Sequence, residues 1–133
     1  MKQGENYTQK TMSKTIFFGT YAIMEIFKGN KDYKIYLDNN IVLTKLNLFE
    51  LYYNLYREYG ESTAKKELER YSSFVIDFDK QIITDAAKLK FIFKKQKMSM
   101  VDCIGYIIAK KLDIKFLTGD EQFKYLPNVE FVK

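Results

Sequence analysis

The sequence predicts one three-layer α/β domain, in which helices cover both faces of a mainly parallel central sheet. A length of 133 residues suits a single hydrophobic core. Hydrophobic residues make up 47% of the chain and charged residues 29%, which is the balance of a globular protein. Short apolar runs alternate with segments of helical period, and this alternation favours right-handed crossovers between parallel strands.

The N-terminal segment differs in composition from the rest of the chain. Residues 1–14 are rich in Gly, Thr, Ser, Asn and Lys and have no apolar centre, so they predict a disordered leader and no signal peptide. We therefore assign the domain to residues 15–133. No apolar run approaches the roughly 18 residues that cross a bilayer, and we expect neither secretion nor membrane insertion.

The domain begins with a predicted strand that leads into helices. Residues 15–18 are an apolar run that stops at Gly19, which is typical of a buried strand followed by a turn. A helix is expected at 21–27, whereas the segment 33–39 fits a helix and a strand equally well. Residues 41–44 are rich in β-branched side chains and predict a second strand.

Helical periodicity marks the middle of the chain. Residues 47–59 carry apolar side chains at helical spacing, and Gly60 follows as a helix terminator. A more polar helix is expected at 61–70. Residues 74–78 combine β-branched and aromatic side chains and predict a third strand.

The C-terminal part repeats the same alternation. One predicted helix has an apolar stripe with lysines on the neighbouring stripe: Ile82, Ala86, Leu89 and Phe93, then Lys90, Lys94 and Lys97. The lysines are candidates for RNA binding, although such faces are often only solvated. A further helix begins after Ser99. Strands are expected at 114–117 and 129–132, with a turn at 118–120.

Composition excludes several kinds of catalysis. The chain contains no His, which removes Ser-His and Cys-His nucleophilic pairs and His-based zinc sites. Cys103 is the single cysteine, so no disulfide can form within the chain, as expected in a reducing cytosol. Catalysis would therefore rest on carboxylates, lysines, hydroxyls or a bound metal. The net charge of +5 favours association with a polyanion such as RNA.

Three acidic residues lie where the predicted strands end. In open parallel sheets, ligands bind outside the carboxyl ends of the strands. Glu50 follows the second strand by a few residues, and Asp120 comes just after the strand at 114–117. Asp102 lies in the first turn of the helix that leads into that strand. The three side chains can therefore converge at one edge of the sheet.

Four segments carry a specific resemblance to a known family. They are Phe17-Phe18-Gly19-Thr20-Tyr21-Ala22, Asn47-Leu48-Phe49-Glu50-Leu51-Tyr52, Ser99 to Tyr106, and Phe116-Leu117-Thr118-Gly119-Asp120. In order, spacing and flanking residues, the chain after residue 14 resembles the PIN-domain family, and within it the VapC-like toxin ribonucleases. The resemblance implies a PIN-like fold and endonucleolytic cleavage of RNA with Mg²⁺ or Mn²⁺.

The same resemblance implies roles for individual residues and partners. Glu50, Asp102 and Asp120 are expected as metal ligands and catalytic acids, Thr118 as an assisting hydroxyl, and Asn47 as a polar neighbour of the site. A cytoplasmic homodimer bound by an inhibitory antitoxin is also expected.

The chain departs from the family pattern at the first motif. The family has an aspartate at the end of the first strand, and this chain has Gly19. Hard cations bind oxygen ligands, and a carboxylate cluster also orients the ion that activates water. We therefore expect cleavage to be weak or absent.

Each acid also has an ordinary structural interpretation. Asp102 follows Ser99 by three positions, a spacing typical of a helix cap. Glu50 shares a polar helix face that fits plain solvation, and Asp120 fits a turn or a short cap. Two further hypotheses therefore stay open beside the nuclease: a catalytically silent module that binds RNA or a protein partner, and an α/β domain with incidental acids.

Overall fold

The structure, a computed structural model, describes residues 15–133, and the leader predicted at 1–14 lies outside the described residues. Four strands form a wholly parallel sheet in the order β2-β1-β3-β4. Their bounds are β1 Thr15–Phe18, β2 Asn40–Val42, β3 Lys115–Thr118 and β4 Val129–Phe131. The parallel pairing confirms the predicted α/β architecture and brings the carboxyl ends of the strands to one edge.

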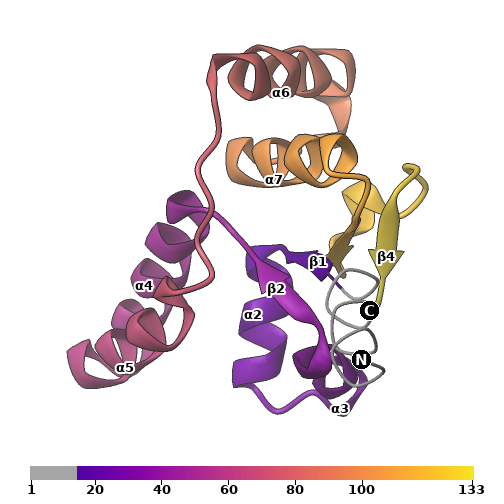
Figure 1. Ribbon diagram of the computed structural model, residues 1–133. Coiled ribbons are helices and arrows are strands. Elements are labelled where there is room, and N and C mark those ends of the chain that lie inside the picture. The colour runs from indigo at the N-terminus through magenta and orange to yellow at the C-terminus, as the bar shows by residue number, and fades with distance from the viewer. Residues whose placement is uncertain (1–14) are drawn as a thin grey trace, which may run out of the picture.

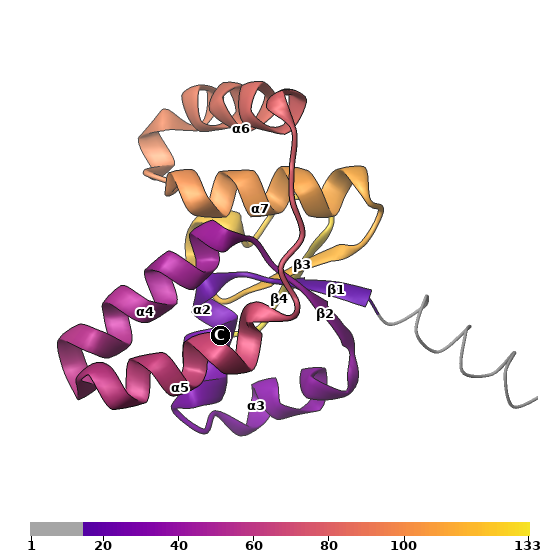
Figure 2. The ribbon, with the colours of Figure 1, turned by 60° about the vertical axis from the view of Figure 1, so that its left-hand side comes forward.

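Helices cover both faces of the sheet (Figure 1). One face carries α2 Thr20–Phe27, α3 Lys31–Lys34, the 3-10 helix η1 Ile35–Asp38, α4 Lys45–Tyr59 and α5 Glu61–Ser72. The other carries α7 Met100–Lys111 and the 3-10 helix η3 Glu121–Phe123, while α6 Lys80–Ile92 and the 3-10 helix η2 Lys94–Gln96 precede α7. Figure 2 shows that α6 lies on the outer side of α7 and is separated from the sheet by it. These layers confirm the predicted three-layer arrangement.

Alternate side chains of β1 enter two separate cores, as the period of two along a strand requires. Ile16 and Phe18 are buried on the side of α2 and α4. Phe17 is buried on the side of α7, where its ring centroid lies 5.7 Å from that of Phe116. Gly105 of α7 permits this packing, because a Cβ at that position would lie 2.6 Å from Phe17 Cε1. The close approach brings the first turn of α7 to the sheet edge.

The structure corrects two predicted strands and decides one segment that the sequence left open. The strand expected at 74–78 is wrong: Val75 alone pairs, in an isolated bridge with Leu43, because the segment touches the edge of β2 and then leaves towards α6. The ambiguous segment at 33–39 is helical, divided between α3 and η1. The strand expected at 114–117 ends one residue later, so that Thr118 belongs to β3 and not to the turn.

The lysine stripe expected on one continuous helix is also wrong. Phe93 has left the helical conformation, with φ −103° and ψ 34°, and α6 ends at Ile92. Lys94 therefore lies in η2, and Lys97 is in the left-handed region at φ 57°. Lys90 alone of the three lies on α6.

The single cysteine and the lengths of the helices complete the description of the fold. Cys103 is buried, and burial raises the pKa of its thiol to about 11, so it packs as a small core residue. Within residues 15–133, each helix is too short or too polar to span a lipid bilayer.

Candidate active site

A chain of hydrogen bonds between side chains joins the start of α2 to the first turns of α4. The Thr20 hydroxyl donates to Glu50 Oε1 at 2.6 Å, and Asn47 Nδ2 donates to the same hydroxyl oxygen at 3.1 Å. Asn47 Oδ1 accepts hydrogen bonds from the amide and the hydroxyl of Thr44 at 2.9 and 2.8 Å. Asn47 is therefore a buried anchor, and Glu50 is held towards the end of β1 and does not simply point into solvent.

Asp102 lies in the first turn of α7, where the capping interpretation is correct. Its amide donates to Ser99 Oγ at 3.1 Å, so Ser99 caps the helix. Burial and, to a smaller extent, the negative charges of Glu50 and Asp120 raise the pKa of the Asp102 carboxyl, a hydrogen bond with Ser99 lowers it, and the resulting pKa is about 7. The three acids therefore share one electrostatic environment in addition to the cap.

Asp120 follows β3 in a tight turn. The buried Thr118 hydroxyl oxygen accepts a hydrogen bond from the Asp120 amide at 3.1 Å. Asp120 Oδ1 accepts from the Gln122 amide at 3.0 Å and so caps η3. The turn interpretation of Asp120 is therefore correct, and Thr118 helps to shape the turn that carries it.

Asp102 and Asp120 border a polar pocket of about 330 Å³ between α2 and α4, whereas Glu50 is not among its lining residues. Its lining consists of Thr20, Tyr21, Met24, Glu25, Lys28, Asn54, Arg57, Glu58, Asp102 and Asp120. Glu25 lines the same pocket, but its carboxylate is engaged by near neighbours in the sequence, since Asn30 Nδ2 donates to it at 2.8 Å and Lys28 pairs with it at 3.7 Å. The sequence reading singled out neither Thr20 nor Arg57, because neither is acidic.

Gly19 precedes α2 in an extended conformation that any residue can adopt, with φ −66° and ψ 161°. The space around it is tighter than its backbone suggests. Its amide donates to the Leu117 carbonyl at 3.1 Å. A Cβ at position 19 would lie 3.1 Å from that carbonyl oxygen and 3.2 Å from Phe116 Cζ. A side chain here therefore requires its neighbours to shift by a few tenths of an ångström.

The carboxylates near the site are the right type of ligand for a divalent ion, but their arrangement suits one less well. Carboxylate oxygens are the ligands that Mg²⁺ and Mn²⁺ prefer. Nevertheless, among residues 15–133, no group of three acidic or thiol side chains is arranged to hold a metal ion. Glu50 is bonded to Thr20, Asp120 is bonded to Gln122, and Gly19 adds no ligand. The site therefore falls short of a complete set of ligands in this arrangement.

The candidate RNA-binding lysines lie near the same end of α7, since η2 leads into Ser99. Lys90 Nζ donates to the Met98 carbonyl at 2.6 Å and is engaged within the protein. Lys94 Nζ lies 4.7 Å from the centroid of the Phe91 ring. Lys94 and Lys97 are exposed and have the freedom to reach a phosphate.

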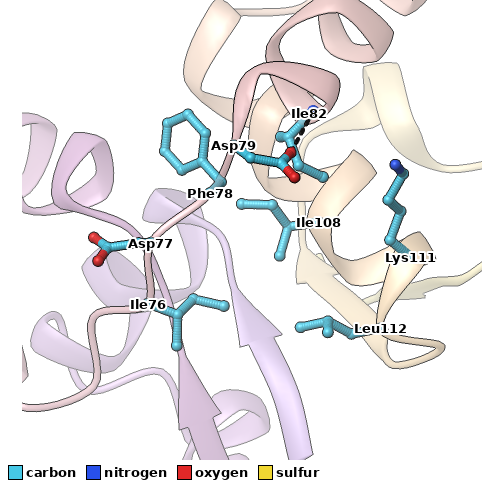
Figure 3. Close-up of a pocket in the computed structure, with 8 residues that line it drawn as sticks. All are labelled: Ile76, Asp77, Phe78, Asp79, Ile82, Ile108, Lys111 and Leu112. Atoms are coloured by element: carbon cyan, nitrogen blue, oxygen red, sulfur yellow. Dashed lines mark hydrogen bonds between the residues drawn. The ribbon is translucent and has the colours of Figure 1, made fainter.

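A larger cavity, of about 640 Å³, lies away from the acids. Figure 3 shows its mainly apolar side chains, which come from the segment before α6, from α6 and from the C-terminal half of α7: Ile76, Phe78, Ile82, Ile108 and Leu112. Asp79, also at its border, caps α6 through the Ile82 amide. Because Asp102 lies at the opposite end of α7, this cavity is separate from the polar pocket.

Solved structures with a similar fold and a family model identify the relatives of this chain. A toxin-antitoxin complex from Klebsiella pneumoniae is similar, with a TM-score of 0.65 and 20% identity over 86% of this chain and 95% of that one. VapBC2 from Rickettsia felis, bound to a DNA fragment from its promoter, is also similar, with a TM-score of 0.68 and 19% identity over 89% of this chain and 97% of that one. No curated protein sequence matches. The PIN-domain family model matches residues 16–129, and the chain therefore belongs to the PIN-domain family.

Proposed function

We propose that this chain is an endoribonuclease scaffold of the toxin-antitoxin kind that uses Mg²⁺ or Mn²⁺, and whose own cleavage is weak or absent. The main support is that Asp102 and Asp120, from distant segments, line one pocket, and that the charges of Glu50 and Asp120, in addition to burial, raise the pKa of Asp102. Carboxylates so close together disfavour one another's charge unless a cation joins them. The missing carboxylate at Gly19 is the reason to expect weak cleavage.

In this proposal each residue has one task. Glu50, Asp102 and Asp120 would hold the ion, which when bound would supply an activated water and stabilise charge on the phosphate. Asn47 positions Glu50 through Thr20, and Thr118 holds the turn of Asp120.

The similar structures and the net charge of the chain support two kinds of partner, an antitoxin and RNA. Two solved neighbours are toxin-antitoxin complexes, which supports an antitoxin as the protein partner. RNA suits the net charge of +5. Lys94 and Lys97, and Lys90 if it leaves Met98, are the proposed contacts to phosphates. We further propose a homodimer that acts in the cytoplasm.

Metal binding is tested by thermal unfolding with and without Mn²⁺. At tenfold its dissociation constant, Mn²⁺ is expected to stabilise the chain by about 1.4 kcal/mol, because it binds only the folded state. Asp120→Asn and Glu50→Gln should each reduce the shift, whereas Asp77→Asn, which changes an exposed acid outside the pocket, should preserve it. A shift that is equal in all four proteins would place the ion elsewhere.

A second candidate function is a silent module that binds RNA or an antitoxin. It is favoured by Gly19 and by the incomplete set of metal ligands in residues 15–133. RNA binding that weakens steeply with salt and survives Asp102→Asn is the expected result, since phosphate contacts depend on cations and not on the metal. Fluorescence anisotropy with labelled single-stranded RNA measures this. Binding that requires Mn²⁺ and is lost in Asp102→Asn would contradict a silent module.

A further inference from the structure

One arginine lines the pocket that contains the acids. Arg57, on α4, borders this pocket together with Asp102 and Asp120. It lies seven residues after Glu50 on the same helix, which is roughly 10 Å along the axis at about 1.5 Å per residue. The pocket is therefore lined by a cation, Arg57, that lies further along α4 than Glu50.

The hydrogen-bond donors of Arg57 are largely available. Its ion pair with Glu58 is long, at 3.5 Å, and the two side chains are 55% and 47% exposed, so the pair contributes little. The guanidinium carbon lies 5.3 Å from the centroid of the Tyr53 ring. A cation–π contact of this kind orients the planar group and leaves its N–H donors free. Arg57 is thus held in place but not neutralised.

Lys28 and Lys90 are other cations near the site. Lys28, on the opposite wall of the pocket, pairs with Glu25 at 3.7 Å and is 54% exposed, so its ion pair is no tighter than that of Arg57. Lys90 donates to a backbone carbonyl. An arginine also presents a rigid fork that matches two oxygens of a phosphate, which a lysine cannot do. Among these residues, Arg57 is therefore the best suited to an oxyanion ligand.

We propose that Arg57 binds a phosphate of single-stranded RNA beside the one that the acids face, and that the Tyr53 ring supports the adjoining base. The inference rests on the proposed RNA substrate. Carboxylates repel a polyanion, so the pocket needs a cation that holds the strand without occupying the acid cluster. Tyr53 is 55% exposed, and aromatic rings are common stacking partners of unpaired bases. Arg57 is in this sense a positioning residue.

The test measures binding of a short, labelled single-stranded RNA without divalent ions, across a series of salt concentrations. Arg57→Ala is expected to weaken binding about tenfold at low salt and to lower the salt slope by about 0.7, the value for one phosphate contact. Arg57→Lys should preserve the slope and lose part of the affinity. Arg70→Ala is the matched control, because Arg70 pairs with Glu67 on α5 outside the pocket, and it should change nothing.

The outcomes separate this inference from the proposed function. An unchanged slope and affinity in Arg57→Ala, with strong RNA binding by the original chain, would overturn the role of Arg57 alone. Equal losses in Arg57→Ala and Arg70→Ala would also overturn it. An original chain that does not bind RNA overturns both proposals. If Arg57→Ala instead weakens only an antitoxin complex, Arg57 is a protein contact and the inference fails. In a Gly19→Asp background, Arg57→Ala should raise KM and leave kcat nearly unchanged.

Discussion

Gly19→Asp is expected to raise Mn²⁺-dependent cleavage of RNA by about a hundredfold or more. Even the outer partners of metal ligands alter affinity or activity by about 10- to 100-fold, and a ligand itself should matter at least as much. Position 19 directly follows β1, and Asp102 lies close enough to Glu50 and Asp120 for their charges, in addition to burial, to raise its pKa, so an added carboxylate would supply the ligand that the proposed metal site lacks. Cleavage of labelled RNA by the two proteins, at matched Mn²⁺, measures the change.

Crowding at position 19 determines the controls. Gly19→Ala introduces the same Cβ against the Leu117 carbonyl and the Phe116 ring without adding a ligand. Overpacking of this kind costs about 1–3 kcal/mol. Gly19→Asn adds the shape of the aspartate without its charge. We expect both variants to remain as inactive as the original chain, and equal, strong cleavage by the original chain and Gly19→Asp would refute the role of the missing carboxylate.

Asp102→Asn is expected to stabilise the metal-free protein at pH 8 by on the order of 2–4 kcal/mol. The pKa of Asp102 is raised from 3.8 to about 7 in the fold, so the folded state retains a proton that the unfolded state has lost. The original chain therefore loses stability as the pH rises from about 4 to about 7, and the asparagine variant does not. Urea unfolding of both proteins at pH 5 and pH 8 measures the difference.

Two comparisons make this result specific. Asp77→Asn removes a charge from an exposed acid outside the polar pocket, and its stability should follow that of the original chain at each pH. Adding Mn²⁺ at pH 8 should narrow the difference between the original chain and Asp102→Asn, because a cation stabilises the ionised carboxylate. An Asp102→Asn variant that is destabilised equally at pH 5 and pH 8 would show that the carboxylate acts only as part of the cap.

The sequence was informative wherever local pattern and topology agree. The alternation of apolar runs with segments of helical period was enough to predict a parallel sheet, because a helix between two strands acts as a crossover that makes them parallel. Glu50 and Asp120 could then be chosen as candidate site residues, because they follow strands and ligands bind at the carboxyl ends of parallel strands. Ser99 was identified as a cap from spacing alone, since a cap acts within three residues of chain.

The sequence was uninformative wherever the deciding contact is distant. Residues 74–78 have the composition of a strand, but Val75 alone pairs with the sheet. Composition does not show over how many residues an edge segment stays paired with the neighbouring strand. No Gly or Pro marks the end of α6 before Phe93. The crowding at Gly19 comes from Phe116 and Leu117, about a hundred residues away. The sequence likewise does not show that the Tyr53 ring is half-exposed beside Arg57.

The order of strands in the sheet has a consequence for synthesis of the protein. β1 is translated about a hundred residues before its central neighbour β3, since Phe17 pairs with Phe116. Contacts between such distant segments form late, because the intervening loop must first be closed. Asp120 follows β3 in the chain. A nascent chain that has not yet reached β3 therefore lacks both the middle of the sheet and Asp120, and the proposed metal site cannot assemble before that segment is made.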